Sequence, residues 1–165
     1  MLTSTLRTSA DEVAVHRTAR LEPGAVVKGP AIIGPNCFIA AAAYLRGGVY
    51  LERDCIIGPS SELKTSVMFA RSKLAHMNFV GDSIIGADVN IEAGVIIANY
   101  RNELESRNIR IGYREQVINT GVGKFGALVG DGSRIGANAV IAPGALLERG
   151  SIVGRLQLID QKPED

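Results

Sequence analysis

Aliphatic and small residues recur along this chain with a period of six. From Leu21 the sequence divides into the hexads LEPGAV, VKGPAI, IGPNCF, IAAAAY, LRGGVY, LERDCI and IGPSSE. Each begins with Leu, Ile or Val and has Ala, Cys, Val or Ser at its fifth position. The pattern returns between Val129 and Ile152 as VGDGSR, IGANAV, IAPGAL and LERGSI. A repeat of this kind is typical of a parallel β-helix.

The period follows from the geometry of a coiled strand. Each hexad forms one flat face and one corner, so three hexads complete a coil. The aliphatic first residue fills the interior, and the fifth residue must be small because it lies inside the corner. Successive coils stack at the strand spacing of about 4.8 Å. We therefore predict an all-β fold in which residues 21–158 form a parallel β-helix.

The repeat is interrupted in two places. Between Leu63 and Ile85 the units LKTSV and VGDSI hold five residues each, so the register slips twice. Hexads then stop at about Asn102, and residues 103–116 are charged and depart from the pattern. This segment is predicted to be a loop that projects from the coil. Long excursions from a repeat fold usually lie where partners or ligands bind.

The two ends are less regular than the middle. Residues 1–20 are predicted to hold a short helix, capped by Ser9 with Asp11 and Glu12 in its first turn, or to be partly disordered. The tail at 159–165 is predicted to be frayed.

Composition narrows the class of protein. The formal net charge is +1, so the chain offers no overall electrostatic attraction to nucleic acid or to an anionic membrane. Its apolar runs are far shorter than the roughly 20 residues needed to cross a bilayer. The first 20 residues lack the apolar stretch of a secretory signal, so we expect a cytoplasmic protein.

Residues 18 positions apart should lie directly above one another. Cys37 and Cys55 have this spacing and are expected to be stacked, reduced core residues. Lys28, Arg46 and Lys64 have it too, at second positions that face outward. Stacked like charges repel. The column is explained if an anion such as a phosphate lies against it, or if the side chains spread into water.

Few residues are suited to catalysis. The chain has two histidines, His16 and His76, so one chain cannot build the three-histidine metal site typical of γ-carbonic anhydrases, and no metal is expected. His76 is either a surface residue or a base that accepts a proton from an amine or a hydroxyl. Asn90 and Asn99 either satisfy backbone groups or orient a ligand and donate to an oxyanion.

One long segment resembles a known family. The string SELKTSVMFARSKLAHMNFVGDSIIGADVNIEAGVIIANY is similar to the acetyltransferase domain of bifunctional N-acetylglucosamine-1-phosphate uridylyltransferases. In that family a lysine is followed twelve residues later by a histidine in a GSKAGHLTYLGD-like turn, then by an NVNIGAG-type hexad and an Asn-Tyr pair. Lys64, His76, DVNIEAG and Asn99–Tyr100 have the same order and spacing.

The resemblance covers about residues 21–155 and implies a fold and an activity. The segment that follows Tyr100 is similar to archaeal-type sugar-1-phosphate nucleotidylyltransferases with amino-sugar-1-phosphate acetyltransferase activity. The implied fold is a left-handed β-helix that forms a homotrimer, with active sites between subunits. The implied activity is acetyl transfer from acetyl-CoA to the amino group of an amino-sugar 1-phosphate or a related sugar nucleotide.

The resemblance also implies roles for individual residues. His76 would be the general base, and Asn99 would orient the substrate or stabilise the tetrahedral oxyanion. Arg46 and Lys64 would hold the sugar phosphate. The further implied contacts are Phe79, Asn90, Tyr100, Arg107 and Arg110 for the substrate, and Ala93, Lys124 and Ala127 for acetyl-CoA.

The sequence departs from the family pattern in ways that leave an alternative. Phe79 replaces a tyrosine of the family, and the loop near Arg107 and Arg110 is about two residues longer than in the archaeal-type proteins. The sequence holds no nucleotidyltransferase domain, so we do not expect uridylyl transfer from it. The alternatives are a non-catalytic β-helix module that partners a separate nucleotidyltransferase, and a sugar O-acyltransferase.

Overall fold

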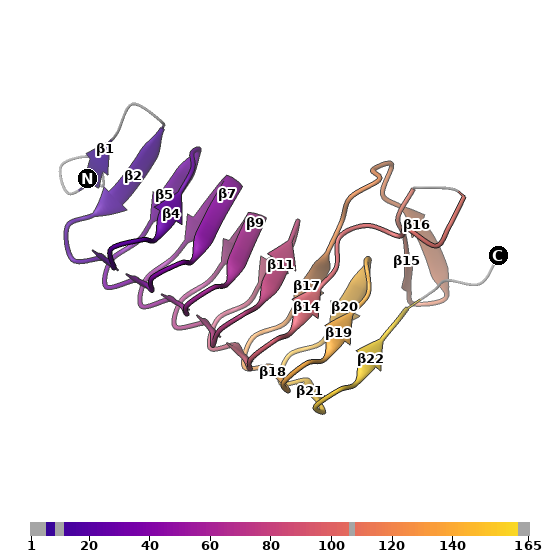
Figure 1. Cartoon of the computed structure of the whole chain (residues 1–165). Coiled ribbons are helices and arrows are strands. Elements are labelled where there is room, and N and C mark those ends of the chain that lie inside the picture. Colours follow the sequence, from indigo (N-terminus) through magenta and orange to yellow (C-terminus); the bar gives the residue numbers. More distant parts are fainter. Residues whose placement is uncertain (1–5, 9–11, 106–107, 162–165) are drawn as a thin grey trace.

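Every regular element that the structure describes is a strand. The computed structural model describes residues 6–8, 12–105 and 108–161. Within these ranges the chain winds into stacked coils whose strands pair in parallel with those of the neighbouring coils (Figure 1). The same ranges contain no helix long and apolar enough to span a membrane. The prediction of an all-β parallel β-helix is confirmed.

The coils have three faces. Face 1 is a sheet made of β3 (Arg20–Leu21), β6 (Phe38–Ile39), β8 (Ile56–Ile57), β10 (Lys73–Leu74), β13 (Asn90–Ile91), β18 (Arg134–Ile135) and β21 (Ile152–Val153). Face 2 holds β4 (Val26–Val27), the first parts of β7 (Tyr44–Leu51) and β9 (Glu62–Met68), then β11 (Phe79–Gly81), β14 (Ile96–Ile97), β19 (Val140–Ile141) and β22 (Leu158–Ile159). Face 3 holds β2 (Val13–His16), β5 (Ala31–Ile33), the second parts of β7 and β9, then β12 (Ile84–Ile85), β17 (Ala127–Val129) and β20 (Ala145–Leu147).

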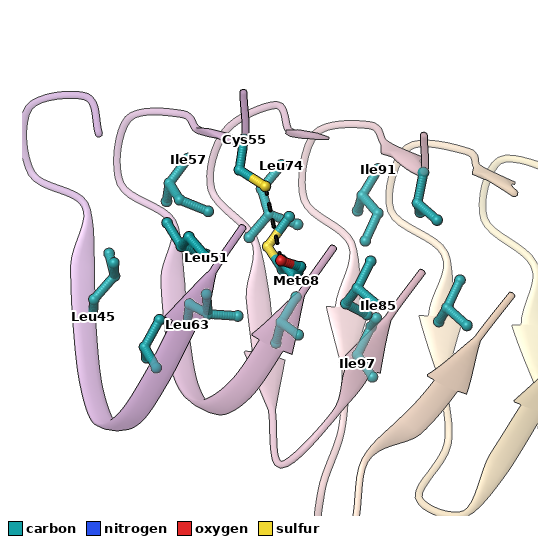
Figure 2. Packing of buried hydrophobic residues seen from close by; sticks show 14 of the residues in the cluster. Leu45, Leu51, Cys55, Ile57, Leu63, Met68, Leu74, Ile85, Ile91 and Ile97 are labelled. Carbon is teal, nitrogen blue, oxygen red and sulfur yellow. Dashed lines mark hydrogen bonds between the residues drawn. The ribbon is translucent and has the colours of Figure 1, made fainter. Parts of the chain in front are cut away.

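The interior is a continuous stack of aliphatic side chains. Along the middle of the β-helix the first residue of each unit points inward and is fully buried, as the predicted repeat requires (Figure 2), whereas Leu21 in the first coil is 39% exposed. The largest of these side chains are Ile33, Ile39, Leu45, Leu51, Ile57, Leu63, Met68, Leu74, Ile85, Ile91 and Ile97. Small residues occupy the inside of the corners, among them Cys37, Ala43 and Cys55. Burial of this stack is the main source of stability.

The two register slips lie at one corner. In β7 the glycines at 47 and 48 turn the chain from face 2 to face 3, and the pairing with β9 shifts between Arg46 and Val49. In β9 the single residue Thr65, with φ of 47°, makes the same turn. In the next coil Asp82, with φ of 49°, takes that place. The five-residue units therefore shorten the corner between faces 2 and 3 and leave the faces in register.

A long excursion leaves the β-helix at this same corner. It starts after Asn99 and returns at Phe125, whose backbone N–H donates to Asn99 O at 3.0 Å. It contains an antiparallel hairpin of β15 (Arg110–Tyr113) and β16 (Gln116–Asn119) beside the C-terminal coils (Figure 1). The predicted loop at 103–116 is thus part of a longer and partly ordered insertion.

A buried arginine ties this excursion to the coils. The side chain of Arg101 is 4% exposed and donates to Pro143 O at 3.0 Å and to Asp160 Oδ1 at 2.7 Å. Its Nη1 also pairs with Glu103 Oε1 at 3.1 Å. Burial acts to lower the pKa of Arg101, but the two carboxylates raise it overall. The base of the excursion is therefore held rigidly against the last coils.

The N-terminal prediction is wrong where the structure describes it. Val13–His16 is strand β2, which pairs in parallel with β5, so the β-helix begins before residue 21. Pairing of residues 13–15 with Ala31–Ile33 of β5 gives this segment its strand partner on face 3. A further strand, β1 (Leu6–Thr8), pairs antiparallel with β2. Ser9 and Asp11 lie outside the described residues.

The C-terminal boundary also differs from the prediction. Ile159 lies in β22 and packs against the core. The side chain of Gln161 donates to Leu146 O at 3.0 Å and accepts from Leu146 N at 2.7 Å. The ordered β-helix therefore extends to residue 161, and residues 162–165 lie outside the described part.

The interior stack predicts that substitution of two adjacent isoleucines in β8 lowers the free energy of unfolding by different amounts. Ile57 is fully buried and Ile56 faces outward. Ile57→Ala should lower the free energy of unfolding by about 2–5 kcal/mol, because it removes apolar contacts and leaves a cavity. Ile56→Ala should lower the free energy of unfolding clearly less. Urea denaturation of both variants checks this, and equal losses would contradict the assigned register.

Candidate functional site

The corner between faces 2 and 3 carries two of the predicted substrate-binding residues, Arg46 and Lys64, together with Asn99. Lys64, Asp82 and Asn99 come from three successive coils. Lys64 Nζ donates to Asp82 Oδ2 at 2.7 Å and to Oδ1 at 3.0 Å, and Asn99 Nδ2 donates to the same carboxylate. The side chains of Lys64 and Asp82 are only 15% and 16% exposed. We call this set, with Arg46 from the preceding coil, the Lys64 corner.

The predicted column of cations exists, but carboxylates of the same chain neutralise most of it. Arg46 and Lys64 are partners across β7 and β9. Arg46 Nε and Nη2 lie 2.7 and 2.6 Å from Glu62 Oε1, and Lys64 is paired with Asp82. Lys28 lies above Arg46 and is exposed. The sequence suggested an external anion to explain this column, and the structure supplies Glu62 and Asp82.

Phe79 covers the Lys64 corner from face 2. A Cβ atom placed on Gly81 would lie 2.9 Å from Phe79 Cζ and 2.7 Å from Asn99 Nδ2. The ring therefore reaches across β11 to the place where the Asn99 amide lies. Gly81 is required because no side chain fits between these two groups.

His76 lies at the other edge of face 2. It belongs to the corner between faces 1 and 2, is exposed, and accepts a hydrogen bond at its backbone oxygen from Gly94 N at 3.0 Å. Five residues separate it from Gly81, which pairs with Lys64, so the two edges lie no more than about 18 Å apart. One chain therefore places the predicted base and the Lys64 corner on the two edges of a single face.

The other predicted residues are spread around the coil. Asn90 is exposed on face 1, where it lines a shallow groove with the ion pair Arg71–Asp88. Ala93 lies in the coil next to His76 and is half-buried. Tyr100 is half-buried at the start of the excursion.

The predicted contacts in and after the excursion lie in different places. Arg110 lies in the hairpin, on β15, and Arg107 lies outside the described residues. Lys124 is exposed where the excursion returns. The side chain of Ala127 is fully buried inside the coil and its backbone N–H donates to Ser83 Oγ at 3.0 Å, so its contact with acetyl-CoA stays a prediction and would have to use the backbone.

Sequence reasoning missed the two carboxylates of this region. Asp82 follows Lys64 by 18 residues, but the shortened units pair Lys64 with Gly81, so Asp82 lies at the corner just after the column. Glu62 is two residues before Lys64 on β9, and its side chain therefore lies on the same outward side. The spacing places Glu62 beside Lys64, but the contact between Asp82 and Lys64 required coordinates.

Comparison with known proteins assigns the family. Residues 9–101, more than half of the chain, match the GMPPB C-terminal domain. The chain belongs to the GMPPB C-terminal domain family. Residues 126–154 match the hexapeptide repeat of succinyl-transferase, in agreement with the repeat of this segment.

Relatives of this family member include bifunctional enzymes. The bifunctional protein GlmU of Methanococcus vannielii is 36% identical over 128 residues, which are 77% of this chain and 30% of that protein. A bifunctional sugar-1-phosphate nucleotidylyltransferase/acetyltransferase of Sulfurisphaera tokodaii is 35% identical over 150 residues, 87% of this chain and 37% of that protein. The chain thus spans about a third of the length of these relatives, and the family resemblance seen in the sequence is confirmed.

Two further comparisons cover more of the matched protein. The uncharacterized acetyltransferase YaiX of Escherichia coli is 30% identical over 153 residues, which are 93% of this chain and 66% of that protein. Among solved structures, AntD, an N-acyltransferase of Bacillus cereus in complex with dTDP and coenzyme A, has a TM-score of 0.50 at 16% identity, over 93% of this chain and 73% of AntD. The AntD likeness supports the fold.

The two cysteines of this GMPPB C-terminal domain are not placed to act as nucleophiles. Both thiols are free and buried. Cys37 Sγ donates to Glu52 O at 2.8 Å, and Cys55 Sγ donates to Phe69 O at 3.2 Å. The adjacent Cys37 thiol and burial raise the pKa of Cys55. The described residues also contain no cluster of three or more His, Cys, Asp or Glu side chains that could hold a metal ion.

This burial predicts that the thiols are unreactive in the folded protein. A raised pKa keeps Cys55 protonated at pH 8, and a disulfide reagent needs an accessible thiolate. Reaction with Ellman's reagent should be at least about 100-fold slower in native protein than in guanidinium, where two thiols per chain should react. Fast labelling of native protein would contradict the buried positions.

Proposed function

We propose that this chain transfers an acetyl group from acetyl-CoA to the amino group of an amino-sugar 1-phosphate or a related sugar nucleotide. The observation that carries the proposal is the placement of an exposed imidazole and a polar, partly buried corner on the two edges of one face. The acetyltransferase names of the relatives support the reaction class.

The proposed chemistry is a direct transfer. The neutral amine nitrogen attacks the thioester carbonyl carbon, a C–N bond forms, and His76 accepts one proton from that nitrogen. The C–S bond then breaks, and the coenzyme A thiolate takes up a proton. The products are an N-acetyl amino sugar and free coenzyme A. No acyl-enzyme is needed, in keeping with the burial of both thiols.

We infer that a second copy of the chain completes such a site. In one chain His76 and the Lys64 corner lie on opposite edges of face 2. A homotrimer with face 2 toward its axis brings the His76 edge of one subunit to the Lys64 corner of the next. Face 2 suits this role because it carries an exposed apolar column of Ile96, Val140 and Leu158.

A non-catalytic module is the second candidate. One observation favours it: the cations that would bind a sugar phosphate are already paired with Glu62 and Asp82. Phe79 also lacks the hydroxyl that a tyrosine would offer. In this case the β-helix would serve as an assembly or regulatory partner of a separate nucleotidyltransferase.

Removal of the proposed base should abolish most of the turnover. With glucosamine 1-phosphate or galactosamine 1-phosphate as acceptor, His76→Ala should lower kcat by about 10²–10⁴-fold, because the amine loses its proton acceptor. Release of coenzyme A thiol from acetyl-CoA measures this. His16→Ala is the matched control, since His16 is the other histidine and lies on face 3.

The outcomes separate the two candidates. Full activity of His76→Ala would overturn the role of His76. Failure of the wild-type protein to acetylate any sugar phosphate or sugar nucleotide would favour the non-catalytic module. Acylation of a hydroxyl in place of an amine would identify an O-acyltransferase.

The proposed assembly is tested by mass. Wild-type protein should have three times the chain mass of 17.5 kDa in solution. Val140→Glu should lower this mass, because it places a charge in the apolar column of face 2. Ile152→Glu, on face 1 and 69% exposed, is the control and should not change it. Light scattering after size exclusion measures both, and a monomeric wild type would leave the proposed site incomplete.

A further inference from the structure

We propose that Asp82 is a positioning residue that decides which atom of Asn99 faces the acceptor and how much charge Lys64 presents to it. This inference rests on the proposed function, because it assigns the acceptor side of that site. Family resemblance gives Asn99 one of two roles, orienting the substrate or stabilising the oxyanion, and gives Asp82 none; the inference selects the first role and assigns its control to Asp82.

The first step concerns the orientation of the Asn99 amide. An ionised carboxylate can only accept hydrogen bonds, and an amide donates only through its nitrogen. Because Asn99 lies against the Asp82 carboxylate, Nδ2 must face Asp82. Asp82 therefore fixes the orientation of the amide, which would otherwise be free to flip.

The second step concerns access to the amide nitrogen. Nδ2 is enclosed by the Asp82 carboxylate and by the backbone of Gly81, next to the tip of the Phe79 ring. One of its two protons is therefore committed to Asp82. The crowding by Gly81 and Phe79 limits the approach of a substrate oxyanion to the other proton.

The third step concerns Asn99 Oδ1. Among the described residues no hydrogen bond donor contacts this atom, and no unpartnered side-chain oxygen of that part of the chain is buried. Oδ1 is thus open to a ligand. As a pure acceptor it can bind an N–H or O–H group.

The fourth step concerns charge. Lys64 Nζ is bonded to both carboxylate oxygens of Asp82, and Thr65 Oγ1 lies 3.3 Å away. All three ammonium protons therefore have partners within the chain. Lys64 presents little net charge to a phosphate as long as Asp82 is ionised.

Together these contacts define the acceptor that the corner suits. Asn99 Oδ1 accepts one N–H of the neutral attacking amine and so aligns the nitrogen lone pair with the thioester carbonyl. The amine keeps this proton in the amide product, and the other proton goes to the His76 side chain that the proposed trimer supplies from the adjacent subunit as the C–N bond forms. Asp82 itself exchanges no proton and acts through Asn99 and Lys64.

The orientation is tested by NMR on the full chain labelled with ¹⁵N. In wild-type protein one Nδ2 proton of Asn99 should be shifted downfield and exchange slowly with water. Both features should be lost in Asp82→Ala and should persist in Asp88→Asn, an aspartate of the same coil whose ion pair with Arg71 is exposed. A fast-exchanging Asn99 amide in the wild type, or an unchanged one in Asp82→Ala, would overturn the proposal.

The charge is tested by kinetics of Asp82→Asn, a variant of the same shape. We expect kcat to fall by about 100-fold, because the amide of Asn99 is no longer held in one orientation. The KM for glucosamine 1-phosphate should fall, because the freed Lys64 ammonium attracts the phosphate. The KM for unphosphorylated glucosamine should not fall, and Asp88→Asn should change neither value.

These two arms distinguish the inference from the proposed function. If the wild type acetylates no acceptor, the proposed function fails, and the NMR arm alone decides how Asn99 is oriented. If the wild type is active and Asp82→Asn leaves kcat and KM unchanged, the positioning role fails. A loss of folded protein alone would lower the active fraction without lowering the KM for the phosphorylated acceptor.

Discussion

The rest of the structure depends on the stacking of one aliphatic side chain on the next, one coil apart. Because neighbouring coils are separated by a single strand spacing, each inward position is in contact with the same position of the coils before and after it. Leu45, Leu63, Val80 and Ile97 follow one another in this way on face 2. Any change in the number of residues on a face would move such a column out of register.

This constraint restricts variation to the corners. The corner between faces 2 and 3 is made by a glycine pair in one coil, by Thr65 in the next and by Asp82 in the one after that. The whole excursion is then inserted at the same corner. Polar side chains thus gather at a corner, where they do not have to pack into the interior. The Lys64 corner is a product of this freedom, because the shortened turns bring Lys64, Asp82 and Asn99 into contact.

Much of the fold could be predicted from the sequence, because one period specifies both the interior and the faces. The inward positions of Ile57 and Ile85 and the stacking of Cys37 on Cys55 follow from it. The helix expected after Ser9 was not predicted correctly. The capping signals are local, whereas the pairing of this segment with β5 is a tertiary contact, and the tertiary contact determines the structure.

The candidate site was predictable only in part. The spacing of Arg46 and Lys64 gave their column, and the resemblance drew attention to His76 and Asn99. Two features required coordinates. Carboxylates of the same chain neutralise the column, and His76 lies across a face from it. The hexad position of His76 was obscured by the two five-residue units that flank it.

The point at which the excursion departs and returns has a further consequence. Phe125 N donates to Asn99 O, and Gly126 N donates to Asp82 O at 2.8 Å. The chain that returns from the excursion therefore pairs directly with the preceding coil, as an uninterrupted coil would. The two stems of the insertion are neighbours, and closing a longer loop between fixed stems costs little extra entropy. A segment of different length and chemistry could therefore replace the excursion at this junction while the coils on either side keep their pairing.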